Sequence, residues 1–313
     1  MLCLSAIQLA SGCKDKIYED REGCPCLLRI GFVDSNNIDS YQIWIFDDDG
    51  NLLKRDNYYP NPGELGKPYY ETSVPRCIFN ICVWGNVGGN TLFVSDGTNS
   101  LLKQNRESPF DRLYFGGASG NSLKEDIVTM DIEMSKQYSA VELNISCKAE
   151  NKIDLDQISV RTITNSIGYY LNGLPIEGIG AIQTPPLSSP YVTKENCKPR
   201  VNCKTQEICK AGEYYKVKGG YKANDDYEAG DGGTVSFEYN MARPVSLSGL
   251  EIGLKEGGKD IITIDLGQML KARSYDINKK NLDDIKIDID LSTGKCLISC
   301  KDWEEIEDVD IVI

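Results

Sequence analysis

The sequence predicts an all-β protein built from two tandem β-sandwich domains. Many short segments alternate apolar with polar residues or are rich in aromatic and β-branched residues, and turn-forming residues separate them. Only residues 265–273 have a pattern compatible with a short helix. Strands at this spacing without helices between them are typical of β-sandwiches. At 313 residues the chain is long for a single core, so two domains are expected.

The chain begins with a predicted export leader. Residues 1–12 contain an apolar run that ends in Ser11 and Gly12, and Cys13 follows. This order is typical of a bacterial lipoprotein signal peptide, which is cut before the cysteine so that its thiol carries the lipid. No Lys or Arg precedes the short run, so the leader of an ordinary secreted protein is the alternative. Both interpretations export the chain, and the charged residues 13–23 are expected to be a tether.

The N-terminal β-sandwich is predicted over residues 24–134. Alternating or β-branched segments indicate its strands, and the stretches 87–90 and 116–118 are interpreted as turns because of their glycines. The expected strands cover residues 27–33, 40–46, 52–55, 69–74, 77–87, 113–115 and 127–134.

A hairpin turn is predicted between the second and third of these strands. The Asp49-Gly50 pair separates two strand-like runs, which is a strong local signal for a hairpin. Asp47, Asp48 and Asp49 before a glycine also suggest a calcium loop. Such a loop needs a glutamate at its twelfth position, which here is Tyr58, so the hairpin is favoured.

The C-terminal β-sandwich is predicted over residues 135–313. A short helix is expected at residues 265–273, and residues 173–231 are interpreted as a long loop that disulfides staple. The expected strands cover residues 140–147, 158–163, 234–239, 250–254, 260–266, 285–291 and the end of the chain up to residue 313.

Ten cysteines follow Cys13, and we expect them to form disulfides. Their number is even and an exported chain meets oxidising conditions. Their spacing lacks the repeated pair of a zinc knuckle, so no metal site is predicted, and spacing alone does not give the connectivity. The ten are Cys24, Cys26, Cys77, Cys82, Cys147, Cys197, Cys203, Cys209, Cys296 and Cys300.

The composition argues against nucleic acid as a partner and against most enzymes. The formal net charge is −13, which repels phosphate backbones. The absence of histidine removes the commonest general base and metal ligand. Glycosidases that use a pair of carboxylates need no histidine and are not excluded by this observation. The acidic pairs Asp283/Asp284 and Glu304/Glu305 are more typical of solvated edges and turns. We therefore predict neither an enzyme nor a cofactor.

Several weak motifs together resemble the FimB-type fimbrial anchor and accessory subunits of Bacteroidales bacteria. They are the lipid-type cysteine, the tether that leads to Arg21-Glu22-Gly23-Cys24-Pro25, the segment 45–52, Val83-Trp84-Gly85-Asn86 and the acidic ending from Asp302. The resemblance implies two transthyretin-like β-sandwiches and a lipid-anchored position at the outer membrane, facing the cell surface. It also implies fimbrial shaft or accessory subunits as partners. The short segment between Cys13 and the first strand leaves little room for a removable strand, which suggests a base or accessory position.

Strand addition is the mechanism that this resemblance suggests. A sheet that lacks a strand exposes unpaired backbone groups, and an incoming strand satisfies them. The C-terminal segment is the candidate donor, with Val309, Ile311 and Ile313 as the side chains that would fill a groove. The alternative is that this segment is an ordinary edge strand of its own domain.

A surface lipoprotein that binds carbohydrate is the competing function. Seventeen tyrosines occur, some of them in adjacent pairs, and their rings can stack on sugars. Neighbours in a strand face opposite sides of the sheet, so each pair would offer only one ring to the surface.

Overall fold

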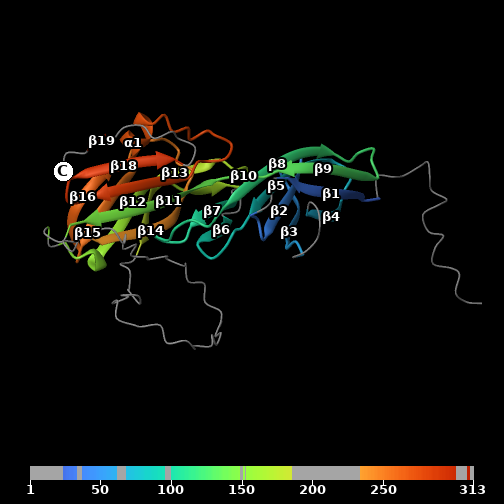
Figure 1. Cartoon of the computed structure of the whole chain (residues 1–313). Helices are drawn as coiled ribbons and strands as arrows, with labels where there is room; N and C mark the ends of the chain where they lie inside the picture. The colour runs from blue at the N-terminus through green and yellow to red at the C-terminus, as the bar shows by residue number, and fades with distance from the viewer. Residues whose placement is uncertain are drawn as a thin grey trace, which may run out of the picture. The chain divides into compact units, whose positions relative to one another are not determined.

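The computed structural model describes residues 24–33, 37–61, 68–95, 100–148, 151, 153–184, 233–300 and 309–310. The leader and the predicted tether, including Cys13, lie outside the described residues. Within them the protein is nearly all β, as predicted, and its strands belong to two units (Figure 1). No helix in these ranges is long and apolar enough to cross a membrane.

Unit 1 comprises Met1–Asn86 and Tyr114–Ser135 and contains two sheets. Its strands are β1 (Cys26–Val33), β2 (Tyr41–Asp47), β3 (Leu52–Tyr58), β4 (Tyr69–Val74), β5 (Ile78–Gly85), β8 (Tyr114–Asn121), β9 (Ile127–Glu133) and β10 (Ser135–Lys136), where the chain passes into unit 2. One sheet has the order β4-β1-β9 and the other has the order β10-β8-β5-β2-β3. β1 is antiparallel to β4 but parallel to β9, which lies about one hundred residues later.

The two sheets of unit 1 pack face to face through alternating apolar residues. Leu28, Ile30 and Phe32 of β1 are fully buried, whereas Arg29 between them is exposed. The Phe32 ring stacks on Tyr41 of β2 in the other sheet, with ring centroids 4.1 Å apart. The period of two in the sequence therefore marks the core face of a sandwich.

The predicted hairpin joins β2 to β3, which pair antiparallel. Gly50 has a φ of 83°, a backbone conformation that favours glycine. The Asp47 carboxylate accepts hydrogen bonds from the Asn51 Nδ2 at 2.9 Å and from the Asn51 backbone N–H at 2.7 Å. These bonds lower the pKa of Asp47. The first aspartate of this run thus closes the turn.

The interpretation of residues 116–118 as a turn is wrong, because they lie inside β8. A Cβ atom at Gly116 would lie 2.5 Å from Ile132 Cγ2 and 2.8 Å from Met134 Sδ. Because Gly116 has no side chain, Ile132 of β9 and Met134 just after it can pack closely against the backbone of β8. A glycine in a strand resembles a turn signal when only the sequence is read.

Unit 2 comprises Val87–Leu113 and Lys136–Ile313. Its strands are β6 (Thr91–Ser95), β7 (Ser100–Gln104), β11 (Tyr138–Cys147), β12 (Ile158–Tyr170), β13 (Pro175–Thr184), β14 (Gly233–Ala242), β15 (Glu251–Glu256), β16 (Lys259–Asp265), β17 (Ile285–Asp290), β18 (Lys295–Cys300) and β19 (Val309–Asp310). One sheet has the order β14-β11-β17-β18-β19 and the other has the order β16-β15-β12-β7-β6, with β13 also paired to β12.

The predicted domain ranges differ from these units in one segment. The range 24–134 places Val87–Leu113 in the N-terminal domain, but this segment supplies β6 and β7 to a sheet of unit 2. Within unit 2, Leu102 and Phe110 are fully buried, and the Phe110 ring meets the Tyr169 ring edge-on at 6.3 Å. Unit 2 is therefore assembled from two separate stretches of the chain.

The core of unit 2 joins apolar side chains from both of its sheets. Leu143 of β11 and Ile252 of β15 belong to one buried cluster. Two buried hydroxyls also meet there, since the Thr162 hydroxyl lies 2.6 Å from the Tyr239 hydroxyl. The predicted short helix is confirmed as α1 (Leu266–Ala272), whose Gln268 N–H donates to the Asp265 carboxylate at 2.8 Å.

The sequence does not predict β13, whose residues fall in the stretch 173–231 that reads as a loop. Its sequence begins with Pro175 and contains Gly178 and Gly180, which replace apolar side chains in an otherwise alternating pattern. Ile176 and Ile182 preserve that alternation at its ends. Register shifts in its pairing with β12 add to the irregularity.

Candidate assembly surfaces

The C-terminal segment is placed at a sheet edge as far as the structure describes it. Val309 pairs with Cys296 and Asp310 pairs with Lys295, so β19 is antiparallel to β18 of the same chain. This is the arrangement expected for an edge strand of its own domain. Of the other predicted donor side chains, Ile311 and Ile313 lie outside the described residues.

β19 covers only a short part of β18. β18 pairs with β17 along its whole length, but its described pairing with β19 is limited to Lys295 and Cys296. The Cys296 side chain is buried and lies 3.9 Å from Met269 Sδ. Burial, with a smaller effect of Asp288, raises the pKa of Cys296 to about 12. Cys296 thus packs into the core beneath this edge as a neutral thiol.

Six of the ten cysteines predicted to form disulfides are free thiols here. No disulfide joins any two of these six, so the prediction receives no support from the described part of the chain. The six are Cys24, Cys26, Cys77, Cys82, Cys147 and Cys296. Cys197, Cys203, Cys209 and the side chain of Cys300 lie outside the described residues. Desolvation raises the pKa of Cys82 to about 11.

β13 exposes an apolar side chain at a second edge of unit 2. Ile179 is 88 % exposed and stands between Gly178 and Gly180. A Cβ atom at Gly178 would lie 2.9 Å from Ile167 Cδ1, so the absence of a side chain lets Ile167 pack beneath the strand. An almost fully exposed isoleucine on an edge strand is a candidate contact for another chain.

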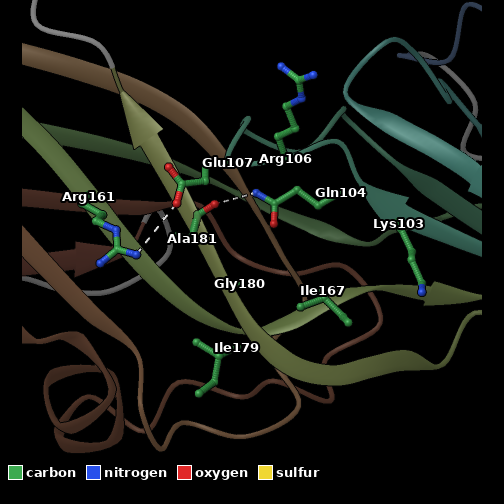
Figure 2. A pocket seen from close by; sticks show the side chains of 9 residues that line it. All are labelled: Lys103, Gln104, Arg106, Glu107, Arg161, Ile167, Ile179, Gly180 and Ala181. Carbon is green, nitrogen blue, oxygen red and sulfur yellow. Dashed lines mark hydrogen bonds and ion pairs between the residues drawn. The ribbon is translucent and has the colours of Figure 1, made fainter.

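A pocket of about 370 Å³ opens beside Ile179 (Figure 2). It combines basic side chains, one carboxylate and aliphatic surface. Its lining residues are Lys103, Gln104, Arg106, Glu107, Arg161, Ile167, Ile179, Gly180 and Ala181, all of them in unit 2. We call this set the β13 pocket.

Hydrogen bonds tie the end of β7 and the segment after it to the C-terminal half of β13. The Gln104 side chain donates from Nε2 to the Ala181 carbonyl at 2.9 Å and to the Ser108 carbonyl at 2.5 Å. The Gln183 backbone N–H donates to the Glu107 carbonyl at 2.8 Å. Figure 2 shows the first of these bonds, which fixes the wall of the pocket.

The charges of the β13 pocket are unbalanced. Arg161 Nη2 lies 3.9 Å from Glu107 Oε1, and both side chains are about half exposed. Lys103 and Arg106 have no dashed contact to another residue drawn in Figure 2. Three cations and one carboxylate therefore line the pocket, which can bind a carboxylate-bearing ligand. The lining holds no hydroxyl or thiol nucleophile.

Sequence reasoning missed this pocket because its residues come from three separate segments. Lys103 lies in β7, which the sequence does not predict, and Arg106 follows that strand. Ile179 lies in the stretch interpreted as a loop. The one available signal is that two cations, Lys103 and Arg106, lie close together in a chain whose net charge is strongly negative.

Two of the adjacent tyrosine pairs face as predicted. Tyr69 is 59 % exposed while Tyr70 is buried, and Tyr170 is 42 % exposed while Tyr169 is buried. Tyr70 donates to an Asp56 carboxylate oxygen at 2.7 Å, and its pKa is raised to about 12, mainly by burial. In these two pairs one ring belongs to the core, so neither pair offers two rings for stacking on a sugar.

Solved structures from Bacteroidales bacteria share the fold. The fimbrial anchor protein Mfa2 from Porphyromonas gingivalis is 10 % identical, with a TM-score of 0.56 over 90 % of this chain and 98 % of that chain. A candidate polysaccharide-binding protein from Bacteroides thetaiotaomicron is 14 % identical, with a TM-score of 0.59 over 90 % and 98 %. A candidate adhesin from Bacteroides ovatus is 13 % identical, with a TM-score of 0.59 over 89 % and 95 %.

The family assignment comes from a sequence comparison. A comparison with curated proteins finds no match. The model of the family described as "Fimbrillin-A associated anchor proteins Mfa1 and Mfa2" matches residues 23–309, which span both units. The resemblance to fimbrial anchor and accessory subunits is thereby confirmed, and this chain belongs to the Fimbrillin-A associated anchor protein family.

Proposed function

We propose that this chain is a fimbrial anchor or accessory subunit that a lipid on Cys13 tethers to the outer membrane. The single observation that carries the proposal is the family match over residues 23–309. Because the family is one of fimbrial anchor proteins, the chain is a structural and non-enzymatic subunit of the cell surface. The lipid tether is supported by the order of residues before Cys13.

We propose strand addition as the way in which the chain joins a fimbrial polymer. The segment from Asp308 to Ile313 is the proposed donor, with Val309, Ile311 and Ile313 as its groove-filling side chains. Two described residue pairs hold β19 on β18, and each backbone hydrogen bond contributes only about 1 kcal/mol net. Pairing of this segment with a strand edge of another subunit would replace the bonds that it makes to β18.

The test uses the full chain, expressed with its leader in the cell of origin in place of the native copy. Deletion of residues 308–313 should leave the chain in the outer membrane but abolish co-isolation of fimbriae after detergent solubilisation. Cys13→Ser should abolish palmitate labelling and release the chain, with its fimbriae, from the membrane fraction.

A control separates attachment from folding. Val309→Ile keeps a β-branched side chain and should retain fimbriae. Circular dichroism of the purified deletion variant should match that of the parent chain. Fimbriae that remain attached to the deletion variant would refute strand donation. An unfolded variant would instead support the edge-strand alternative for residues 308–313.

A further inference from the structure

We propose that the β13 pocket binds an extended acidic segment of a partner subunit. Carboxylates of that segment would lie against Lys103, Arg106 and Arg161, and an aliphatic side chain would cover Ile179. The inference rests on the proposed function only where it identifies the partner as a fimbrial subunit. The chemistry of the segment comes from the pocket itself.

The local charge of the pocket selects an anionic partner in spite of the net charge of the chain. The chain carries a formal charge of −13, yet charges farther away than about 8 Å are largely screened at physiological salt. Three of the nine lining residues are cationic and one is anionic. Only Arg161 has a carboxylate within 4 Å among the described residues that line the pocket. A carboxylate-bearing segment supplies the missing negative charges.

The apolar part of the pocket selects an aliphatic neighbour for those carboxylates. Ile179 is 88 % exposed, and Ile167 borders it beneath Gly178. Covering Ile179 removes apolar surface from water without displacing any described contact of this side chain. Figure 2 shows Ile179 on the strand that also presents Gly180 and Ala181 to the pocket.

The strand edge favours a peptide over a carbohydrate. None of the nine lining residues is aromatic, whereas sugar-binding clefts use the flat faces of aromatic rings. The Ala181 carbonyl and the Gln183 N–H already have partners, from Gln104 and Glu107. An incoming segment therefore meets β13 near Ile179, where an extended chain can run alongside an edge strand.

The last nine residues of this chain provide a probe of the required chemistry. Residues 305–313 have the sequence EIEDVDIVI, in which acidic and aliphatic residues are interspersed. A fluorescent peptide of this sequence is titrated with the full chain in detergent, and anisotropy is recorded at 50 and 300 mM NaCl. We expect saturable binding that weakens about tenfold at the higher salt. The neutral peptide QIQNVNIVI should not bind.

Variants locate the binding to the β13 pocket. The double variant Lys103→Gln/Arg106→Gln should weaken binding by about tenfold or more and flatten its salt dependence. Ile179→Ser should weaken binding about tenfold but keep the salt dependence. The matched controls are Lys259→Gln/Lys271→Gln, which removes two exposed cations elsewhere in unit 2, and Leu123→Ser, which removes an exposed apolar side chain of unit 1. Both controls should bind as the parent chain does.

Each outcome of the peptide titration and of the co-isolation experiment distinguishes the two proposals. Absence of saturable binding, or equal weakening in the pocket variants and the controls, excludes the β13 pocket as the site. A peptide that binds while fimbriae fail to co-isolate with the full chain refutes the proposed function and leaves the pocket assignment intact. Fimbriae that co-isolate while the peptide fails to bind refute the pocket assignment alone.

Discussion

Arg243 shows how one side chain can organise a loop of unit 2. Its guanidinium donates to the backbone carbonyls of Ile277 at 2.5 Å, Lys279 at 2.9 Å and Lys280 at 3.1 Å. Its Nε donates to the Gln137 side-chain oxygen at 3.0 Å. Burial lowers the pKa of Arg243, and the guanidinium remains a cation at neutral pH. The cation thus satisfies carbonyls that no strand partner reaches.

We predict that Arg243→Ala destabilises unit 2 by about 2–4 kcal/mol, because several carbonyls lose a charged donor at once. The measurement is urea unfolding followed by circular dichroism. Lys255→Ala is the control, since Lys255 makes one exposed ion pair, to Asp260 at 2.9 Å. Its effect should stay below about 1 kcal/mol. Similar losses for both variants would contradict the assignment of a structural role to Arg243.

At the residue scale, the sequence revealed which side chains face the core but not which polar groups meet. Arg29 stands out as exposed between Leu28 and Ile30 by alternation alone. Nothing local to Arg243 indicates that its partners lie more than thirty residues away. The same limit applies to the cysteines, because pairing depends on distances that spacing does not encode.

At the element scale, strands with an uninterrupted alternation could be predicted. β1, β11 and β17 were expected almost within their observed bounds, since each buries every second residue. β8 and β13 could not, because glycines occupy positions where a side chain would have shown the period. Part of the candidate pocket was missed for this reason.

The glycines of β8 give a direct test of close packing. Gly116→Val should destabilise unit 1 by about 1–3 kcal/mol or more, because a Cβ atom there would lie 2.5 Å from Ile132 Cγ2. Gly117→Val is the matched control: its Cβ atom would meet nothing nearer than 3.4 Å and would project to the exposed side. Thermal unfolding of the two variants distinguishes them. Equal midpoints would show that the strand can shift to accept the side chain.

At the scale of the whole molecule, the sequence indicated two sandwiches but not that one of them is discontinuous. Composition changes little between Asn86 and Tyr114, so no boundary signal marks the segment that joins unit 2. This segment belongs to unit 2 because β7 pairs with the C-terminal part of β12, which lies more than sixty residues later in the sequence. Local periodicity does not report contacts of this kind.

We therefore predict that residues 135–313 alone are unstable. This fragment lacks Leu102 and Phe110, both fully buried in unit 2, and each large apolar side chain lost from a core costs about 2–5 kcal/mol. Circular dichroism should show a lower thermal midpoint for the fragment than for the full chain. A synthetic peptide of residues 87–113 added in trans should raise it. A fragment that melts like the full chain would contradict the assignment of Val87–Leu113 to unit 2.

The parallel strand pairings determine the order in which the sheets can form as the chain is synthesised. The parallel pairing of β1 cannot form before β9 is made, and that of β11 cannot form before β17, which begins only at Ile285. During synthesis from the N-terminus, β1 can pair with β4 on one edge, but its other edge stays unpaired until β9 is made about one hundred residues later. In unit 2, β11 can pair with β14 before β17 completes its other edge. Incomplete copies of the chain therefore present unpaired strand edges, which can pair with one another before the late strands arrive.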